Sequence, residues 1–111
     1  MFKIFNIFTK NTKKIIIIMI ELSDKKEVYS IKNSGEKVKV SGRITVEGDN
    51  RVSEFSGQFS DLEGTWLGNF YYAESAEGKI NQNVNEVGTD YIAAANELLL
   101  STVSEFKNRT E

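Results

Sequence analysis

The clearest pattern along the chain is a strict alternation of small or apolar residues with polar residues between Glu36 and Glu47. The first set consists of Val38, Val40, Gly42, Ile44 and Val46, and the residues between them are Lys39, Ser41, Arg43 and Thr45. A period of two is typical of an antiparallel strand that is buried on one face only. This segment therefore predicts a strand with one side on a core and the other in solvent.

Similar but shorter segments lie before and after this strand. The run EVYSI precedes it, and alternating segments follow at about 53–60, 65–73 and 79–85. Turn-forming sequences separate them, namely NSG at 33–35, EGDN at 47–50, LE at 62–63 and SAEGK at 75–79. The order of strands and short turns predicts an antiparallel meander of about five strands.

The hairpin formed by the segments 36–47 and 53–60 has two possible registers that keep the apolar residues of both strands on one face. A loop at Gly48-Asp49 sets Gly42 opposite Phe55, and a loop at Asp49-Asn50 sets Gly42 opposite Gly57. A shift by one residue would turn the phenylalanines of the second strand to solvent, so it is disfavoured.

The next two hairpins follow the same reasoning. A two-residue loop at Leu62-Glu63 pairs Phe59 with Trp66 and Gly57 with Gly68. In the last hairpin, a three-residue loop with Gly78 in the left-handed conformation pairs the residues Phe70 with Val84 and Tyr72 with Gln82.

The segment 91–109 predicts the helix that closes the core. Its apolar residues Ile92, Ala95, Leu99, Val103 and Phe106 recur at helical spacing. Thr89 or Asp90 is expected to cap its first turn. The fold class is therefore α+β, an antiparallel β-meander with one C-terminal α-helix across one face, in a single domain at residues 23–111.

Three glycines fall on the predicted apolar face. Gly42, Gly57 and Gly68 would form a shallow trough into which the alanines of the helix fit. Strong curvature of the sheet is an alternative explanation for glycines inside strands, and space for a ligand is another.

The first 22 residues differ from the rest. They carry a net charge of +3, from four lysines and Glu21, which leaves −5 for residues 23–111 in a chain of net charge −2. The run from Ile15 to Ile20 is too short for a secretion signal or a transmembrane helix, which predicts a cytoplasmic protein without an integral membrane segment. Residues 1–22 are expected to be a basic and apolar tail, disordered or preceding the true start. An edge strand formed by the isoleucine run, or weak membrane-surface contact of residues 1–18 through a short helix, are alternatives.

The composition narrows the chemistry. The 111 residues contain no cysteine and no histidine, which removes disulfides, thiol catalysis and the commonest general base and metal ligand. No catalytic set, metal site or cofactor site is visible in the sequence, so the expected protein is not an enzyme and needs no cofactor.

The polar face of the predicted sheet is the candidate binding surface. Its candidate residues are Lys37, Lys39, Arg43, Leu67, Asn69 and Tyr71. A tyrosine among adaptable polar groups favours a protein partner, either another protein or a second copy of the chain. Lysine and arginine beside an aromatic residue would also suit single-stranded nucleic acid. A small-ligand carrier with its pocket between helix and sheet is a third hypothesis.

Overall fold

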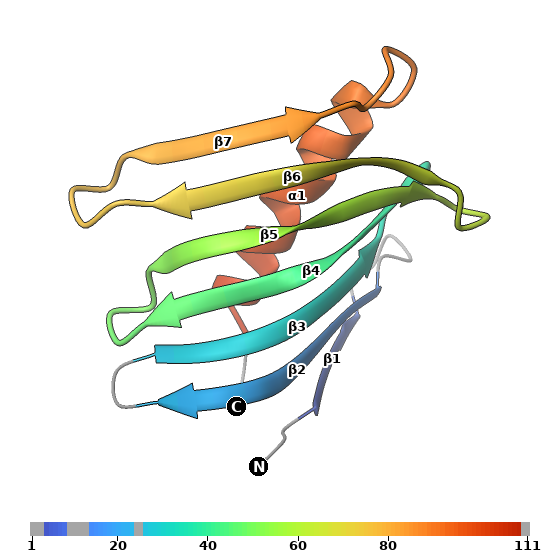
Figure 1. Ribbon diagram of the computed structural model, residues 1–111. Helices are drawn as coiled ribbons and strands as arrows, with labels where there is room; N and C mark the ends of the chain where they lie inside the picture. The colour runs from blue at the N-terminus through green and yellow to red at the C-terminus, as the bar shows by residue number, and fades with distance from the viewer. Residues whose placement is uncertain (1–3, 9–13, 24–25, 110–111) are drawn as a thin grey trace.

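The computed structural model describes residues 4–8, 14–23 and 26–109, and it has one antiparallel sheet with a helix on one face (Figure 1). Each strand pairs with the next along the chain, in the order β1 to β7. The elements are β1 Ile4–Phe8, β2 Lys14–Ser23, β3 Lys26–Ser34, β4 Val38–Glu47, β5 Val52–Asp61, β6 Trp66–Glu74, β7 Ile80–Asn85 and α1 Ile92–Lys107. The predicted α+β class and meander are confirmed, with seven strands where about five were expected.

The two additional strands come from the N-terminal segment. β2 pairs with β3 along its whole length, and the side chains of Ile15, Ile17 and Met19 are buried. The sheet therefore begins before residue 23, the boundary expected from the sequence. Ile16 and Ile18 are half-buried on the other face, so the run is apolar on both faces and lacks the alternation that would identify a strand.

The rest of the N-terminal segment is only partly described. Residues 4–8 form β1, which pairs with β2, so this stretch is a strand and not the short helix considered for membrane contact. Phe2, Lys3, Lys10 and Lys13 lie outside the described residues.

The register between β4 and β5 is one of the two expected. Gly42 lies opposite Gly57 and Ile44 opposite Phe55. The loop has three residues, with Asn50 at a φ of 63° and the amide of Glu47 bonded to the carbonyl of Arg51 at 2.9 Å. A bulge after Thr45 restores the pairing of the apolar faces.

The expected register between β5 and β6 is wrong. Gly57 lies opposite Phe70, and Phe59 lies opposite Gly68. The turn from Asp61 to Thr65 has three central residues and ends in Gly64, at a φ of 95°. A bulge then places Leu67 between two paired residues. The β6–β7 register is confirmed, with Phe70 opposite Val84 and Tyr72 opposite Gln82.

The glycines inside the strands lie where the backbone of the neighbouring strand leaves no room for a side chain. A Cβ atom at Gly42 would collide with the carbonyl oxygen of Ser56, and one at Gly57 with that of Ser41. For both positions the nearest atoms belong to the neighbouring strand and not to α1. The expected trough that receives the alanines of the helix is therefore wrong, because these glycines accommodate the backbone of the neighbouring strand. At Gly68, which has a φ of 152°, a Cβ would collide with the carbonyl of Asn85.

The helix α1 runs obliquely across one face of the sheet (Figure 1). It buries Ala95, Leu98, Leu99, Thr102, Val103 and Phe106. The side-chain amide of Asn33 on β3 donates a buried hydrogen bond of 2.8 Å to the hydroxyl of Thr102, which donates in turn to the carbonyl of Leu98. Both side chains are nearly inaccessible to water, and this bond satisfies the amide of Asn33 that would otherwise be buried without a partner.

The two ends of α1 are held differently. The expected cap by Thr89 or Asp90 is wrong, because Tyr91 occupies the cap position and makes no side-chain bond there. At the other end, Arg109 lies 4.0 Å from the ring centre of Phe106 and 5.1 Å from that of Tyr29. Burial, and then the hydrogen bond from the Tyr29 hydroxyl to Glu27, raise the pKa of Tyr29 to about 12.

Glu74, at the end of β6, joins the sheet to the last turn of the helix. Its carboxylate accepts bonds from the Lys107 ammonium at 2.7 Å, the Tyr72 hydroxyl at 2.6 Å and the backbone amide of Val52 at 3.1 Å. Burial opposes ionisation of this carboxyl, but the three donors outweigh that effect and hold the pKa of Glu74 below its usual value.

We expect Gly57→Ala to lower the free energy of unfolding by roughly 1–3 kcal/mol, because the new methyl group must displace the backbone of β4. Urea denaturation followed by circular dichroism measures the change. Gly48→Ala is the matched control, since a Cβ there meets nothing within 4 Å, and its midpoint should stay near that of the wild type. Equal midpoints for the two variants would contradict the proposed role of Gly57.

We expect Glu74→Gln to lower the free energy of unfolding at pH 7 by roughly 1.5–3 kcal/mol, the usual worth of hydrogen bonds to a charged group. Because the folded-state pKa of Glu74 is depressed, its contribution is present above the unfolded-state value and is lost as the pH falls through the folded-state value. The variant should therefore lose less stability than the wild type between pH 5 and strongly acidic pH. Glu77→Gln, in an exposed turn, is the control. If the free energy of unfolding fell in parallel with pH for the wild type and Glu74→Gln, the proposed role of Glu74 would be contradicted.

Candidate binding face

The face of the sheet opposite α1, here called the open face, is built by the polar residues of the alternating strands. The pairing aligns them in rows that cross the sheet. One row consists of Lys32, Ser41, Gln58, Asn69 and Asn85, and the next of Ser30, Arg43, Ser56, Tyr71 and Asn83. Hydroxyl and amide groups dominate both rows, and the amide of Asn85 donates to Asn69 at 3.1 Å.

A shallow depression lies in the middle of the open face. It has a volume of about 410 Å³, and the backbone of Gly42 and Gly57 contributes to its floor. The other lining residues are Ser41, Arg43, Ser56, Gln58, Trp66 and Asn69. The side chains around this backbone floor come from the neighbouring residues on β4, β5 and β6.

Trp66 is the largest side chain at this depression, and 49% of it is exposed to solvent. It lies opposite Ser60, and the bulge at Leu67 separates it from the inward-facing Gly68 and Phe70. Without the bulge, the alternation that buries Phe70 would also bury Trp66. The bulge is therefore what turns the indole ring toward the open face.

The structure brings together four of the six candidate residues. Lys39, Arg43 and Asn69 are exposed on the open face, and Tyr71 is half-buried opposite Ser56. These four positions agree with the alternation of β4 and β6, from which the sequence analysis placed them.

The other two candidates lie elsewhere. Leu67 is partly buried and packs against the core, because the bulge directs it inward. Lys37 precedes β4, and its ammonium donates to the carbonyl of Asp90 at 2.9 Å and lies 5.3 Å from the ring centre of Tyr91. Its positive charge is therefore engaged at the start of α1 and is not available on the open face.

Trp66 is the residue that the sequence analysis missed. The two-residue loop expected between β5 and β6 pairs Trp66 with Phe59, which is buried, and so implies a buried tryptophan. The two turns DLEGT and SAEGK both have Glu-Gly at the same positions, and the second was correctly given a three-residue loop ending in glycine. Treating both turns alike would have moved Trp66 out of register with Phe59.

The chemistry of the depression is that of a recognition surface. Arg43 is the only charged residue among the described residues that line it, and Trp66 offers an indole ring with a hydrogen-bond donor. Serine, glutamine and asparagine side chains can both donate and accept hydrogen bonds. These groups can bind and orient a partner surface, and none of them forms a general acid–base pair.

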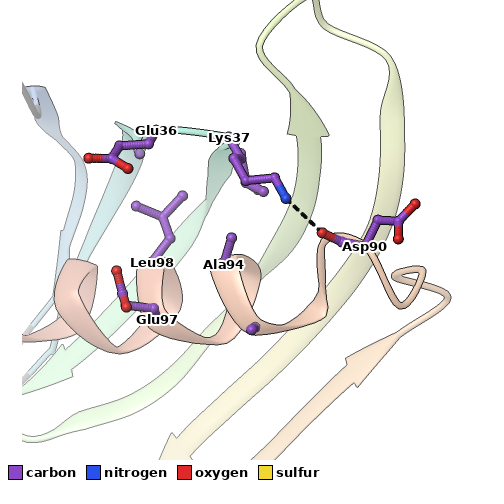
Figure 2. A pocket seen from close by; sticks show the side chains of 9 residues that line it. Glu36, Lys37, Asp90, Ala94, Glu97 and Leu98 are labelled. Carbon is purple, nitrogen blue, oxygen red and sulfur yellow. Dashed lines mark hydrogen bonds between the residues drawn. The ribbon is translucent and has the colours of Figure 1, made fainter.

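A second hollow, of about 440 Å³, lies between the β3–β4 turn and the start of α1 (Figure 2). Val38, Ala94 and Leu98 give it an apolar part, and Lys37 closes one side through its bond to Asp90. Figure 2 shows the carboxylates of Glu36 and Asp90 on opposite sides of the hollow, so they do not converge on one point. Within the described ranges, no group of three or more acidic residues is placed to hold a metal ion.

Two further results bear on function. Across residues 4–8, 14–23 and 26–109, the structure has no helix with the length and apolar character that crossing a membrane requires. Comparison of the chain with protein-family models, with curated proteins and with solved structures gives no match.

Proposed function

We propose that this protein is a small non-enzymatic binding module that docks a protein partner on the open face of its sheet. The observation that carries the proposal is the half-exposed Trp66 beside Arg43 at the edge of the central depression. Tryptophan, tyrosine and arginine are the residues that most often dominate the binding energy of protein interfaces. Tyr71, in the row next to Asn69, adds a third residue of this kind.

The rigidity of the surface supports the same function. Each of β4, β5 and β6 is paired on both sides, and the residues on their other face are in the buried core. The backbone of such a platform is already ordered before a partner binds, so binding costs less conformational entropy than it would on a loop, which favours affinity.

Charge narrows the class of partner. Three cations, Lys32, Lys39 and Arg43, are exposed on the open face beside the exposed Glu54, whereas residues 23–111 have a net charge of −5. Two copies meeting through this face would bring an excess of cations from each copy into one interface, and like charges oppose such contact. The open face therefore suits a neutral or acidic surface of a different protein better than a second copy of itself.

Single-stranded nucleic acid is the second candidate for this face, because Trp66 and Tyr71 offer rings on which bases can stack beside Arg43 and Lys39. Two observations weaken this alternative. Lys37 is engaged at the start of the helix, and the acidic balance of the chain opposes phosphate binding. A cytoplasmic location remains a prediction from the sequence.

We expect Trp66→Ala to weaken partner binding at least about 30-fold, the effect of a hot-spot residue worth 2 kcal/mol or more. Proteins retained by the immobilised wild-type chain from cells that express it identify the partner, and titration with the purified partner measures the change in Kd. Leu62→Ala is the matched control, because Leu62 is also an exposed apolar residue near this hairpin but does not line the depression.

The unfolding midpoint of Trp66→Ala should change little, since the indole is half-exposed. Undiminished binding by a folded Trp66→Ala variant would overturn the proposal. Tight binding of a labelled single-stranded oligonucleotide that weakens steeply with added salt would replace it with the nucleic-acid alternative.

A further inference from the structure

The strand β7 forms one edge of the sheet, with no further strand beyond it in the described part of the chain (Figure 1). Its hairpin with β6 is closed by a hydrogen bond of 2.9 Å from the amide of Ser75 to the carbonyl of Lys79. Hydrogen-bonded and non-hydrogen-bonded pairs alternate along an antiparallel ladder. Asn81, Asn83 and Asn85 therefore bond to β6, and the main-chain groups of Ile80, Gln82 and Val84 point outward from the edge.

This edge lacks the usual features that prevent strands from pairing with other chains. Exposed edges are commonly protected by charged residues, proline or a bulge. The sequence of β7, INQNVN, contains no charged residue and no proline, and its pairing with β6 is regular. Ile80 is 58% exposed, which adds an apolar side chain at the same edge.

We propose that β7 pairs with β7 of a second copy, antiparallel and about a two-fold axis at Gln82. This register pairs Ile80 with Val84, and Asn81 with Asn83, of the other copy. Lys79 then faces Asn85, so no two like charges lie opposite one another. The exposed Ile80 gains an apolar neighbour on the helix side of the sheet, where Val84 already packs against the core.

The asparagines argue for a second copy over a different chain. An amide side chain donates and accepts hydrogen bonds, so a row of amides is complementary to its own antiparallel image. The molecule already contains one such contact, in which Asn85 donates to Asn69 across β6 and β7. Asn81 and Asn83 are exposed on the open face, and the two-fold axis brings each of them beside the other in the second copy.

The proposed dimer is independent of the partner site on the open face and leaves it accessible. A two-fold axis perpendicular to the sheet joins two seven-stranded sheets into one of fourteen strands, with both depressions on the same side. A partner with two recognition elements would then bind with an avidity beyond that of either site.

Light scattering coupled to size-exclusion chromatography, over a range of protein concentrations, tests the proposal. We expect the wild-type chain to shift from monomer to dimer as its concentration rises. Asn81→Lys with Asn83→Lys should raise the dimer dissociation constant at least tenfold, because each new lysine lies opposite a lysine of the other copy. The matched control, Ser104→Lys with Asn108→Lys, adds the same charge at exposed positions near the end of α1. These positions lie outside the proposed interface, so the control should leave the constant unchanged.

Hydrogen exchange locates the interface directly. In the dimer, the amides of Ile80, Gln82 and Val84 should exchange more slowly at high protein concentration than at low concentration, and the amides of Asn81 and Asn83 should not respond. A wild-type chain that stays monomeric at millimolar concentration would overturn the proposal. A dimer that persists unchanged in the folded double-lysine variant would do the same, since it would have to form elsewhere.

Discussion

The structure depends on the covering of one face of a seven-stranded sheet by a single helix of 16 residues. Because no other element among the described residues covers this face, β2 to β7 each place apolar side chains on the side of the sheet that α1 covers. The buried bond between Asn33 and Thr102 helps to fix which face of the helix meets the sheet, since a rotation of α1 would take the Thr102 hydroxyl away from the buried side-chain NH2 of Asn33. The contacts of Glu74 with Lys107 and of Arg109 with Tyr29 then hold the end of the helix against the sheet.

The same requirement explains the irregularities of the strands. The turns of β4–β5 and β5–β6 each have three residues, which would shift the following strand out of alignment with the core. A bulge in each hairpin corrects the pairing, at Ser53 in one and at Leu67 in the other. The bulge at Leu67 corrects the orientation only of the residues that follow it. Trp66, which precedes the bulge, therefore stays on the open face.

Local sequence patterns predicted the fold class, the helix and the β6–β7 register, where alternation and a glycine turn agree. For β4–β5 they left two registers open, one of which is observed. They favoured a tail over residues 1–22 and offered a strand at the isoleucine run only as an alternative, because a run that is apolar on both faces has no period to detect. They misplaced Leu67 and Trp66, because a bulge changes which face a residue occupies without changing the composition of the strand. They also misplaced Lys37, whose long side chain reaches the start of α1, a contact that depends on tertiary structure alone.

The position of Trp66 has a consequence for how the molecule can be observed. It is the single tryptophan of the chain, and it already contacts water in the folded state. Because about half of Trp66 is already exposed in the folded chain, we expect its emission to change less on unfolding than that of a fully buried tryptophan. The same indole is an intrinsic optical probe at the central depression, so contact with another molecule is visible there without attaching any label.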